Sequence, residues 1–196
     1  MKEPSLLKGE LRRSIRKRLD RMSDSDQRQH SEKARRLLEN QSAWKNAKRI
    51  LFYAPVPGEL DVWPLFEDAV NADKEAFLPR FVAAETQRSA HLYAACAVRN
   101  LKRELKAGQF GIREPLDTCP EIPLNRLDFV LVPGVAFDLQ GRRLGRGKGY
   151  YDRMLAAVRG KTCGVAFDEQ IVEELPVEPH DVHVNCILTP TRWIEL

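Results

Sequence analysis

The chain contains the run Arg49-Ile50-Leu51-Phe52-Tyr53-Ala54, which is closed by Pro55, Pro57 and Gly58. Every residue after Arg49 is apolar, so the run lacks the polar alternation of a strand that has one face in water. Similar apolar runs recur between helical or loop stretches at 76–78, 91–95, 129–132 and 163–167. The pattern predicts an α/β fold of three layers, in which an open, mostly parallel sheet lies between two layers of helices.

Two helices are expected before this strand. An apolar stripe at intervals of three and four residues predicts the first helix, and its members are Leu7, Leu11, Ile15, Leu19 and Met22. Ser23 and Asp26 have the spacing of a capping box, which predicts the start of a second helix. We expect these two helices to form an N-terminal helical hairpin. Beyond the strand, Asp61 is expected to be the N-cap of a third helix.

The 196 residues, 43% of them hydrophobic, suit a single domain that spans 1–196. A net charge of +4 is far below that of a protein that coats nucleic acid. Residues 1–9 lack the apolar run of a secretory signal, and no stretch reaches the roughly 20 apolar residues of a membrane-spanning helix. Four scattered cysteines argue against a zinc site and against a disulfide framework. We therefore expect a cytoplasmic monomer that binds small molecules, without nucleic acid or membrane partners.

A glycine-rich, cationic segment precedes a helical run at 150–158, and its sequence is Arg143-Leu144-Gly145-Arg146-Gly147-Lys148-Gly149-Tyr150-Tyr151-Asp152. Glycine lets backbone N–H groups turn towards an anion, and the start of a helix adds partial positive charge. The segment is not a dinucleotide motif, which needs glycine at position 150, nor a Walker loop, which needs Ser or Thr after the lysine. It predicts an anion-binding loop. The alternative is a basic turn that merely joins two elements.

The glycine-rich segment belongs to a longer stretch, 131–153, that resembles the signature of the 5-formyltetrahydrofolate cyclo-ligase family. Further landmarks of that family occur in order along the chain, namely Lys8-x-x-x-Arg12, Pro57-Gly58-Glu59, Leu78-Pro79-Arg80, Gly111-Ile112-Arg113-Glu114-Pro115 and the stretch 175–181. The resemblance implies an architecture similar to that of sugar-phosphate isomerases and coenzyme A transferases. It also implies ATP-dependent cyclisation of 5-formyltetrahydrofolate to 5,10-methenyltetrahydrofolate, with release of ADP and phosphate, through a phosphorylated formyl intermediate.

The resemblance assigns roles to individual residues of this chain. It implies that Arg146 and Lys148 act in catalysis. The implied ATP contacts are Lys8, Arg12, Arg143, Leu144, Gly145, Arg146, Gly147, Lys148, Gly149, Tyr150 and Tyr151. The implied contacts to the reduced folate are Arg12, Ala54, Glu59, Arg146, Gly147, Lys148, Gly149 and Tyr150. The resemblance places Mg²⁺ at Asp152 and Asp181, whose carboxylate oxygens suit this hard cation.

The residues alone leave other roles open. Glu59 can be an exposed loop carboxylate, Asp152 can complement a helix dipole, and the basic face of the first helix can simply be solvated. His180 and His183 flank Asp181, but the preceding proline argues against a helix that would bring both to one face. Two other functions compete with the cyclo-ligase. One is a module that binds nucleic acid through the first helix, and the other is an isomerase or transferase that shares the fold without needing ATP.

Overall fold

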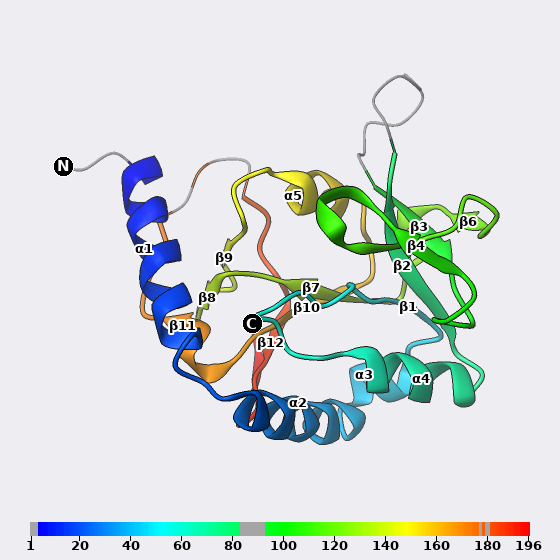
Figure 1. Ribbon diagram of the computed structural model, residues 1–196, viewed down its shortest axis with the longest axis horizontal. Coiled ribbons are helices and arrows are strands. Elements are labelled where there is room, and N and C mark those ends of the chain that lie inside the picture. Colours follow the sequence, from blue (N-terminus) through cyan, green and yellow to red (C-terminus); the bar gives the residue numbers. More distant parts are fainter. Residues whose placement is uncertain (1–3, 83–92, 177, 179–180) are drawn as a thin grey trace.

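The computed structural model describes residues 4–82, 93–176, 178 and 181–196 (Figure 1). Its α-helices are α1 (Pro4–Leu19), α2 (Asp24–Glu39), α3 (Ser42–Asn46), α4 (Trp63–Asn71) and α5 (Tyr150–Leu155). Short 3-10 helices are η1 (Gln109–Gly111), η2 (Leu124–Arg126) and η3 (Asp168–Gln170). The strands are β1 (Arg49–Leu51), β2 (Glu75–Phe81), β3 (Tyr93–Ala97), β4 (Leu105–Ala107), β5 (Arg113–Pro115), β6 (Glu121–Ile122), β7 (Phe129–Pro133), β8 (Ala136–Asp138), β9 (Arg143–Leu144), β10 (Lys161–Val165), β11 (Ile171–Val172), β12 (Cys186–Leu188) and β13 (Trp193–Glu195).

Within the described residues, the main sheet has eight strands in the order β13-β12-β10-β7-β1-β2-β3-β6. The strands from β12 to β2 are parallel to one another. The outer strands β13, β3 and β6 each run antiparallel to the neighbour nearer the centre. The expected α/β fold with an open, mostly parallel sheet is therefore confirmed.

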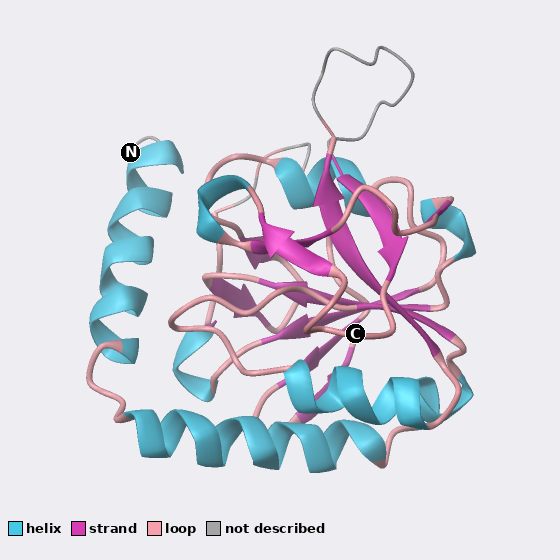
Figure 2. Ribbon diagram, turned by 45° about the vertical axis from the view of Figure 1, so that its right-hand side comes forward, coloured by secondary structure: helices cyan, strands magenta, loops and turns pink. Residues whose placement is uncertain are grey.

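Helices cover both faces of the main sheet, as Figure 2 shows. On one face, Leu38 of α2 and Phe66 of α4 belong to a core cluster with Phe129 of β7. On the other face, Met154 of α5 belongs to a second cluster with Val130 of β7. Successive residues of β7 thus enter opposite cores, which explains why the run at 129–132 has no polar alternation.

The order of the strands reverses between β1 and β7. From β1 the chain passes through α4 to β2 on one side, whereas from β7 it reaches β10 on the other side. Segments that leave the carboxyl ends of two such strands diverge, and ligands of open α/β sheets bind in the crevice between them. Here these segments are 52–60, which contains Glu59, and 134–149, which contains the glycine-rich segment. The topology alone therefore predicts a ligand site between them.

Helix α1 packs beside the small sheet, whose strand order is β11-β8-β9. Its Ile15 is fully buried in a cluster with Ala136, Leu144 and Leu175. Leu38 of α2 belongs instead to the core of the main sheet. The expected helical hairpin is wrong, because the two helices do not run side by side (Figures 1 and 2) and only Leu19, at the end of α1, also packs against the core of α2.

Local signals place most element ends within one or two residues. The capping box at α2 is confirmed, since the Asp26 N–H donates to Ser23 Oγ at 3.1 Å and the Ser23 N–H to Asp26 Oδ2 at 3.3 Å. The N-cap of α4 is Val62, one residue after the expected Asp61. Strand β3 begins at Tyr93, and the first two residues of the expected strand at 91–95 lie outside the described residues. None of the helices described here combines the length and the apolar character needed to cross a lipid bilayer.

Candidate functional site

The glycine-rich segment joins β9 to α5, and each of its glycines has its own structural reason. Gly147 and Gly149 have φ angles of 92° and 63°, in the left-handed region that favours glycine. Gly149 is also the N-cap of α5. At Gly145 a Cβ would lie 2.9 Å from Arg143 Nη1, so a larger residue would force the Arg143 guanidinium to shift. The segment is therefore a shaped loop, which disfavours the alternative of an incidental basic turn.

Arg12 brings α1 to this loop. Its Nε donates a hydrogen bond to the Gly145 carbonyl at 2.9 Å, and its Nη2 would lie 3.4 Å from a Cβ at Gly147. A side chain at position 147 would contact the guanidinium at an ordinary distance, so the backbone φ of 92° is what disfavours it. The arrangement places one cation of the N-terminal helix directly against the expected anion site, 133 residues away in sequence.

Lys8, one helical turn earlier, is buried and binds two carboxylates. Its Nζ donates to Glu178 Oε2 at 2.6 Å and to Asp181 Oδ2 at 2.9 Å. Burial alone would lower the pKa of this ammonium, but the two carboxylates raise it above its ordinary value. Lys8 and Arg12 therefore have different partners, two carboxylates for the first and the Gly145 carbonyl for the second. Glu178 was not anticipated from the sequence, since nothing in the spacing of the chain connects it with α1.

Glu59 meets Arg146 at the switch point. Arg146 Nη2 donates to Glu59 Oε1 at 2.9 Å, and the Val56 N–H donates to Glu59 Oε2 at 3.2 Å. Burial raises the pKa of Glu59, and the neighbouring guanidinium opposes that rise. Ala54, between β1 and this turn, is also buried. The loop after β1 thus presents one anchored carboxylate to the glycine-rich segment, rather than an exposed loop carboxylate.

Arg143 is buried beneath the loop and has internal partners. Its Nη2 donates to Asp152 Oδ1 at 2.7 Å and its Nη1 to the Pro133 carbonyl at 3.3 Å. The guanidinium also lies 5.6 Å from the centre of the Tyr151 ring. The side chain of Arg143 is only 3% exposed, so this residue supports the loop from below. Leu144 likewise points into the cluster around Ile15, which leaves only its backbone for a nucleotide.

Lys148 differs from the other cations of the segment. Its side chain is exposed, and within the described part of the chain its ammonium makes no hydrogen bond or ion pair. Its carbonyl accepts a 3.5 Å hydrogen bond from Arg153 Nη2, which helps to fix the backbone before α5. Lys148 is therefore a charge held on a defined backbone and available to an anion.

An aromatic cluster lies beside the loop. Tyr150 is 5.9 Å, between ring centres, from both Phe81 and Tyr93, and Tyr93 is 6.1 Å from Tyr151. Burial raises the pKa of the Tyr93 and Tyr151 hydroxyls, so they stay neutral. Rings of this kind suit the faces of a flat heterocycle. Sequence reasoning missed Phe81 and Tyr93, because only the antiparallel register of β2 with β3 makes them partners.

Asp152 and Asp181 each offer carboxylate oxygens, but both are already paired with a cation. Asp152 Oδ1 binds Arg143, and Asp181 Oδ2 binds Lys8 and the Glu178 N–H. Among the described residues, no three His, Cys, Asp or Glu side chains lie close enough together to hold a metal ion. Mg²⁺ is usually bound by one or two carboxylates together with substrate phosphates, so this donor set fits the ion in that mode.

Arg80 and Arg113, which lie in family landmarks without an assigned role, and Asn185 near the end of the chain have structural contacts. Arg80 donates to the Leu116 carbonyl at 2.8 Å and pairs with Glu121. Arg113 binds the Leu101 carbonyl and lies 5.3 Å from the centre of the Trp63 ring. Asn185 accepts hydrogen bonds from the Thr162 N–H and hydroxyl at 2.8 and 2.9 Å, which joins β10 to the segment before β12.

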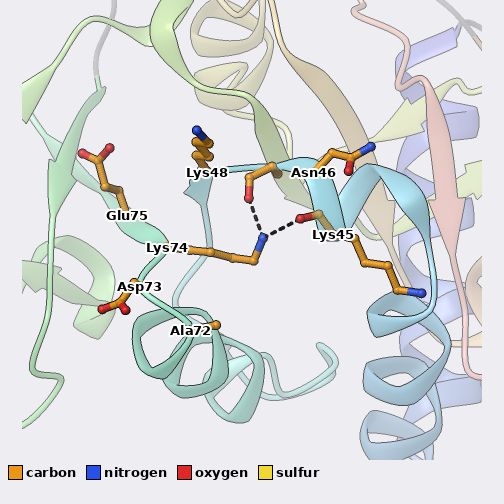
Figure 3. A pocket seen from close by; sticks show the side chains of 8 residues that line it. Lys45, Asn46, Lys48, Ala72, Asp73, Lys74 and Glu75 are labelled. Atoms are coloured by element: carbon orange, nitrogen blue, oxygen red, sulfur yellow. Dashed lines mark hydrogen bonds between the residues drawn. The ribbon is translucent and has the colours of Figure 1, made fainter.

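A surface pocket of about 590 Å³ lies at the opposite end of β1 and β2, away from the glycine-rich segment (Figure 3). Lys74 extends across it and donates to the carbonyls of Trp44, Lys45 and Ala47 at 3.0, 3.0 and 2.6 Å. These three bonds use all the donors of the ammonium and satisfy carbonyls at the end of α3. The pocket therefore belongs to the scaffold.

Lys74→Met is expected to lower the free energy of unfolding by about 1–2 kcal/mol, because the carbonyls at the end of α3 lose their donor. Urea denaturation measures the change. Lys48→Met is the matched control, since it removes an exposed ammonium from the same pocket without breaking a side-chain hydrogen bond of the described residues. Equal effects of the two substitutions would contradict the structural role of Lys74.

Comparison with known proteins agrees with the geometry of this site. The model of the 5-formyltetrahydrofolate cyclo-ligase family matches residues 5–190. The 5-formyltetrahydrofolate cyclo-ligase of Escherichia coli K12 is 36% identical over 166 residues, which cover 74% of this chain and 86% of that protein. That of Haemophilus influenzae is 34% identical over 184 residues, which cover 91% of this chain and 95% of that protein.

Solved structures lead to the same family. The NMR structure of Aquifex aeolicus 5,10-methenyltetrahydrofolate synthetase superimposes with a TM-score of 0.84 at 36% identity, covering 97% of this chain and 93% of that chain. Fold, sequence identity and the family model thus agree over almost the whole length. This chain therefore belongs to the 5-formyltetrahydrofolate cyclo-ligase family and is an enzyme of the ligase class.

Proposed function

We propose that this cyclo-ligase uses ATP and Mg²⁺ to convert 5-formyltetrahydrofolate to 5,10-methenyltetrahydrofolate, with release of ADP and phosphate. The family supports the cyclo-ligase activity itself. The observation that carries the finer proposal is the 2.9 Å contact between Arg146 and Glu59. It joins a cationic loop suited to phosphate with a buried carboxylate suited to the N–H groups of a pterin. Two chemically different ligands can therefore meet at one place.

The chemical difficulty is that an N-formyl group is a resonance-stabilised amide whose oxygen leaves poorly. If the formyl oxygen attacks the γ-phosphorus, the bond to ADP breaks and a phosphorylated formyl group forms on N5. N10 then attacks the activated carbon and loses its proton, and phosphate leaves with the former formyl oxygen as the ring closes. Catalysis of this kind asks the protein mainly for alignment and for stabilisation of moving negative charge.

Residues of the glycine-rich segment and of the loop after β1 are proposed to share this work. Arg146 and Lys148 are proposed to stabilise charge on the transferred phosphoryl group, with backbone N–H groups of the glycine-rich segment beside them. Arg12 is proposed to contact both ligands, because it lies against Gly145 at the base of the loop. Glu59 is proposed to accept hydrogen bonds from the pterin, and Tyr150 to lie against a ring face. Lys8 reaches ATP only if it exchanges its present carboxylate partners for phosphate.

Asp152 is the proposed principal Mg²⁺ ligand, and Asp181 the second. Mg²⁺ bound there would neutralise phosphate charge as it shifts during transfer. Arg143 holds one oxygen of Asp152, which orients the carboxylate at the start of α5. The proposal includes a single-domain monomer in the cytoplasm, in keeping with four free, buried thiols. Size-exclusion chromatography and cell fractionation test that part.

The decisive test mixes the purified chain with 5-formyltetrahydrofolate, Mg²⁺ and ATP and follows the near-ultraviolet absorbance of the methenyl product. We expect absorbance that rises only when ATP and Mg²⁺ are both present, together with stoichiometric ADP. Product formed without ATP, or no product in the complete mixture, would contradict the proposal. Omission of Mg²⁺ with excess chelator separates the metal requirement from the nucleotide requirement.

A further inference from the structure

One ion pair joins the proposed ATP site to the proposed folate site. Arg146, expected on phosphate, donates to Glu59, expected on the pterin, at 2.9 Å. The side chain of Arg146 is 61% exposed, whereas that of Glu59 is only 11% exposed. The contact therefore engages both the guanidinium proposed to bind the phosphoryl group and the carboxylate proposed to bind the pterin.

Glu59 is the fixed partner of this pair. Its Oε2 accepts from the Val56 N–H at 3.2 Å, and its own N–H donates to the Val56 carbonyl at 3.0 Å. Arg146 instead stands between Gly145 and Gly147, on an exposed part of the loop. Exchange of partners therefore requires only a movement of the Arg146 side chain, while the carboxylate stays where it is.

Each ligand competes with the pair for a different reason. A phosphoryl group is best bound by a guanidinium through two parallel N–H donors, which turns the fork away from Glu59. The pterin edge carries neighbouring amino and ring N–H donors, which need carboxylate oxygens as acceptors. Oε1 already accepts from Arg146 and Oε2 from the Val56 N–H, so a pterin that binds both oxygens competes with the guanidinium for Oε1.

We infer, on the basis of the proposed function, that the Glu59–Arg146 pair couples the two ligand sites: each ligand competes with the pair and displaces it, so either ligand promotes binding of the other. When both ligands bind, the free-energy cost of separating the pair arises once and not twice. The coupling is therefore positive and equal in both directions. Because Arg146 is well exposed, we expect a factor of about five to ten, near the lower end of usual coupling factors.

Isothermal titration calorimetry of the full chain in the presence of Mg²⁺ tests the coupling. The probes are 5-formyltetrahydrofolate and the slowly hydrolysed ATP analogue adenylyl imidodiphosphate. We expect the Kd of each probe to fall about fivefold to tenfold when the other is saturating. Equal or weaker binding in the presence of the second ligand would overturn the coupling and leave the proposed function standing. Failure of either probe to bind the wild-type chain would overturn both.

Glu59→Gln separates the pair from the rest of the site. We expect E59Q to bind 5-formyltetrahydrofolate more weakly, yet to bind the ATP analogue alone about fivefold to tenfold more tightly than the wild type does. The variant should then match the affinity of the folate-saturated wild type for the analogue. General damage to the fold would weaken the binding of both ligands, so tighter binding of one and weaker binding of the other is specific to the pair.

Asp61→Asn is the matched control for the loss of charge. Asp61 is exposed in the same loop, and its Oδ1 accepts from the Trp63 N–H at 2.9 Å, which an asparagine oxygen can also do. We expect D61N to keep the affinity for the ATP analogue and the coupling factor of the wild type. Equal tightening in E59Q and D61N would assign the effect to charge alone and overturn the inference. Unchanged or weaker binding of the analogue to E59Q would also overturn the inference. The coupling factor of the wild type tests the inference independently of either variant.

Discussion

Lys148→Ala is expected to lower kcat by about two to three powers of ten, with little change in stability. The ammonium is exposed and has no hydrogen-bond or ion-pair partner among the described residues, so its removal breaks no internal contact there. Its backbone carbonyl accepts a hydrogen bond from Arg153, and the glycines on both sides have left-handed φ angles. The ammonium is therefore free to bind a phosphoryl group, and loss of one donor to developing charge costs a rate factor of this size.

The measurement is steady-state formation of the methenyl product at saturating ATP and folate, beside a urea unfolding curve of the same preparation. Lys33→Ala is the control, because Lys33 is an exposed lysine of α2 at the far side of the main sheet. It should leave kcat unchanged while making the same change in net charge. Lys148→Arg should retain part of the activity. Near-normal kcat in Lys148→Ala would remove this residue from the phosphoryl site.

Arg143→Met is expected to lower the free energy of unfolding by about 3 kcal/mol. The side chain of Arg143 is 3% exposed and that of Asp152 is 16% exposed, so the substitution leaves a largely buried carboxylate without its cation. The Pro133 carbonyl loses a donor as well. The residual exposure of Asp152 keeps the expected loss at the lower end of the range for buried pairs.

Urea denaturation of the variant measures this loss, and the double variant R143M/D152N tests its cause. Replacing Asp152 by neutral asparagine should restore part of the stability, because the unpaired charge is then gone. Arg36→Met is the control for loss of an exposed pair, since Arg36 is 74% exposed and binds Glu32 on the same helix. If Arg143→Met shifts the unfolding midpoint no more than Arg36→Met does, the Arg143–Asp152 pair is not a support of the loop.

The strands β1, β2, β7 and β10 were predictable because burial on both faces leaves an unbroken apolar run in the sequence, whereas the equally buried β12 was missed. β7 shows this most clearly, as Phe129 and Val130 enter opposite cores. The edge strands were not predictable in the same way: β6 and β13 are short, and Glu121 and Glu195 interrupt their apolar pattern. The packing of α1 was misjudged because periodicity shows that a helix has an apolar face but does not show which core receives it.

The glycine-rich loop was predictable because glycine suits the local backbone. Gly147 and Gly149 have positive φ angles, and Arg143 lies close to Gly145. The partners of its cations were not predictable. Pairing of Arg146 with Glu59 joins residues 87 apart in sequence. Such contacts depend on the order of strands in the sheet, which no local pattern encodes.

The attachment of α1 has a consequence for the time at which this enzyme becomes competent during its synthesis. Helix α1 is synthesised long before its partners, because Arg12 binds a loop 133 residues later and Lys8 binds carboxylates 170 and 173 residues later. Ile15 likewise becomes buried only after Ala136, Leu144 and Leu175 have been made. Contacts of such long sequence separation form slowly. The nascent chain therefore carries an amphipathic helix without these partners until Asp181 has been made, and the ligand site is completed only after that point.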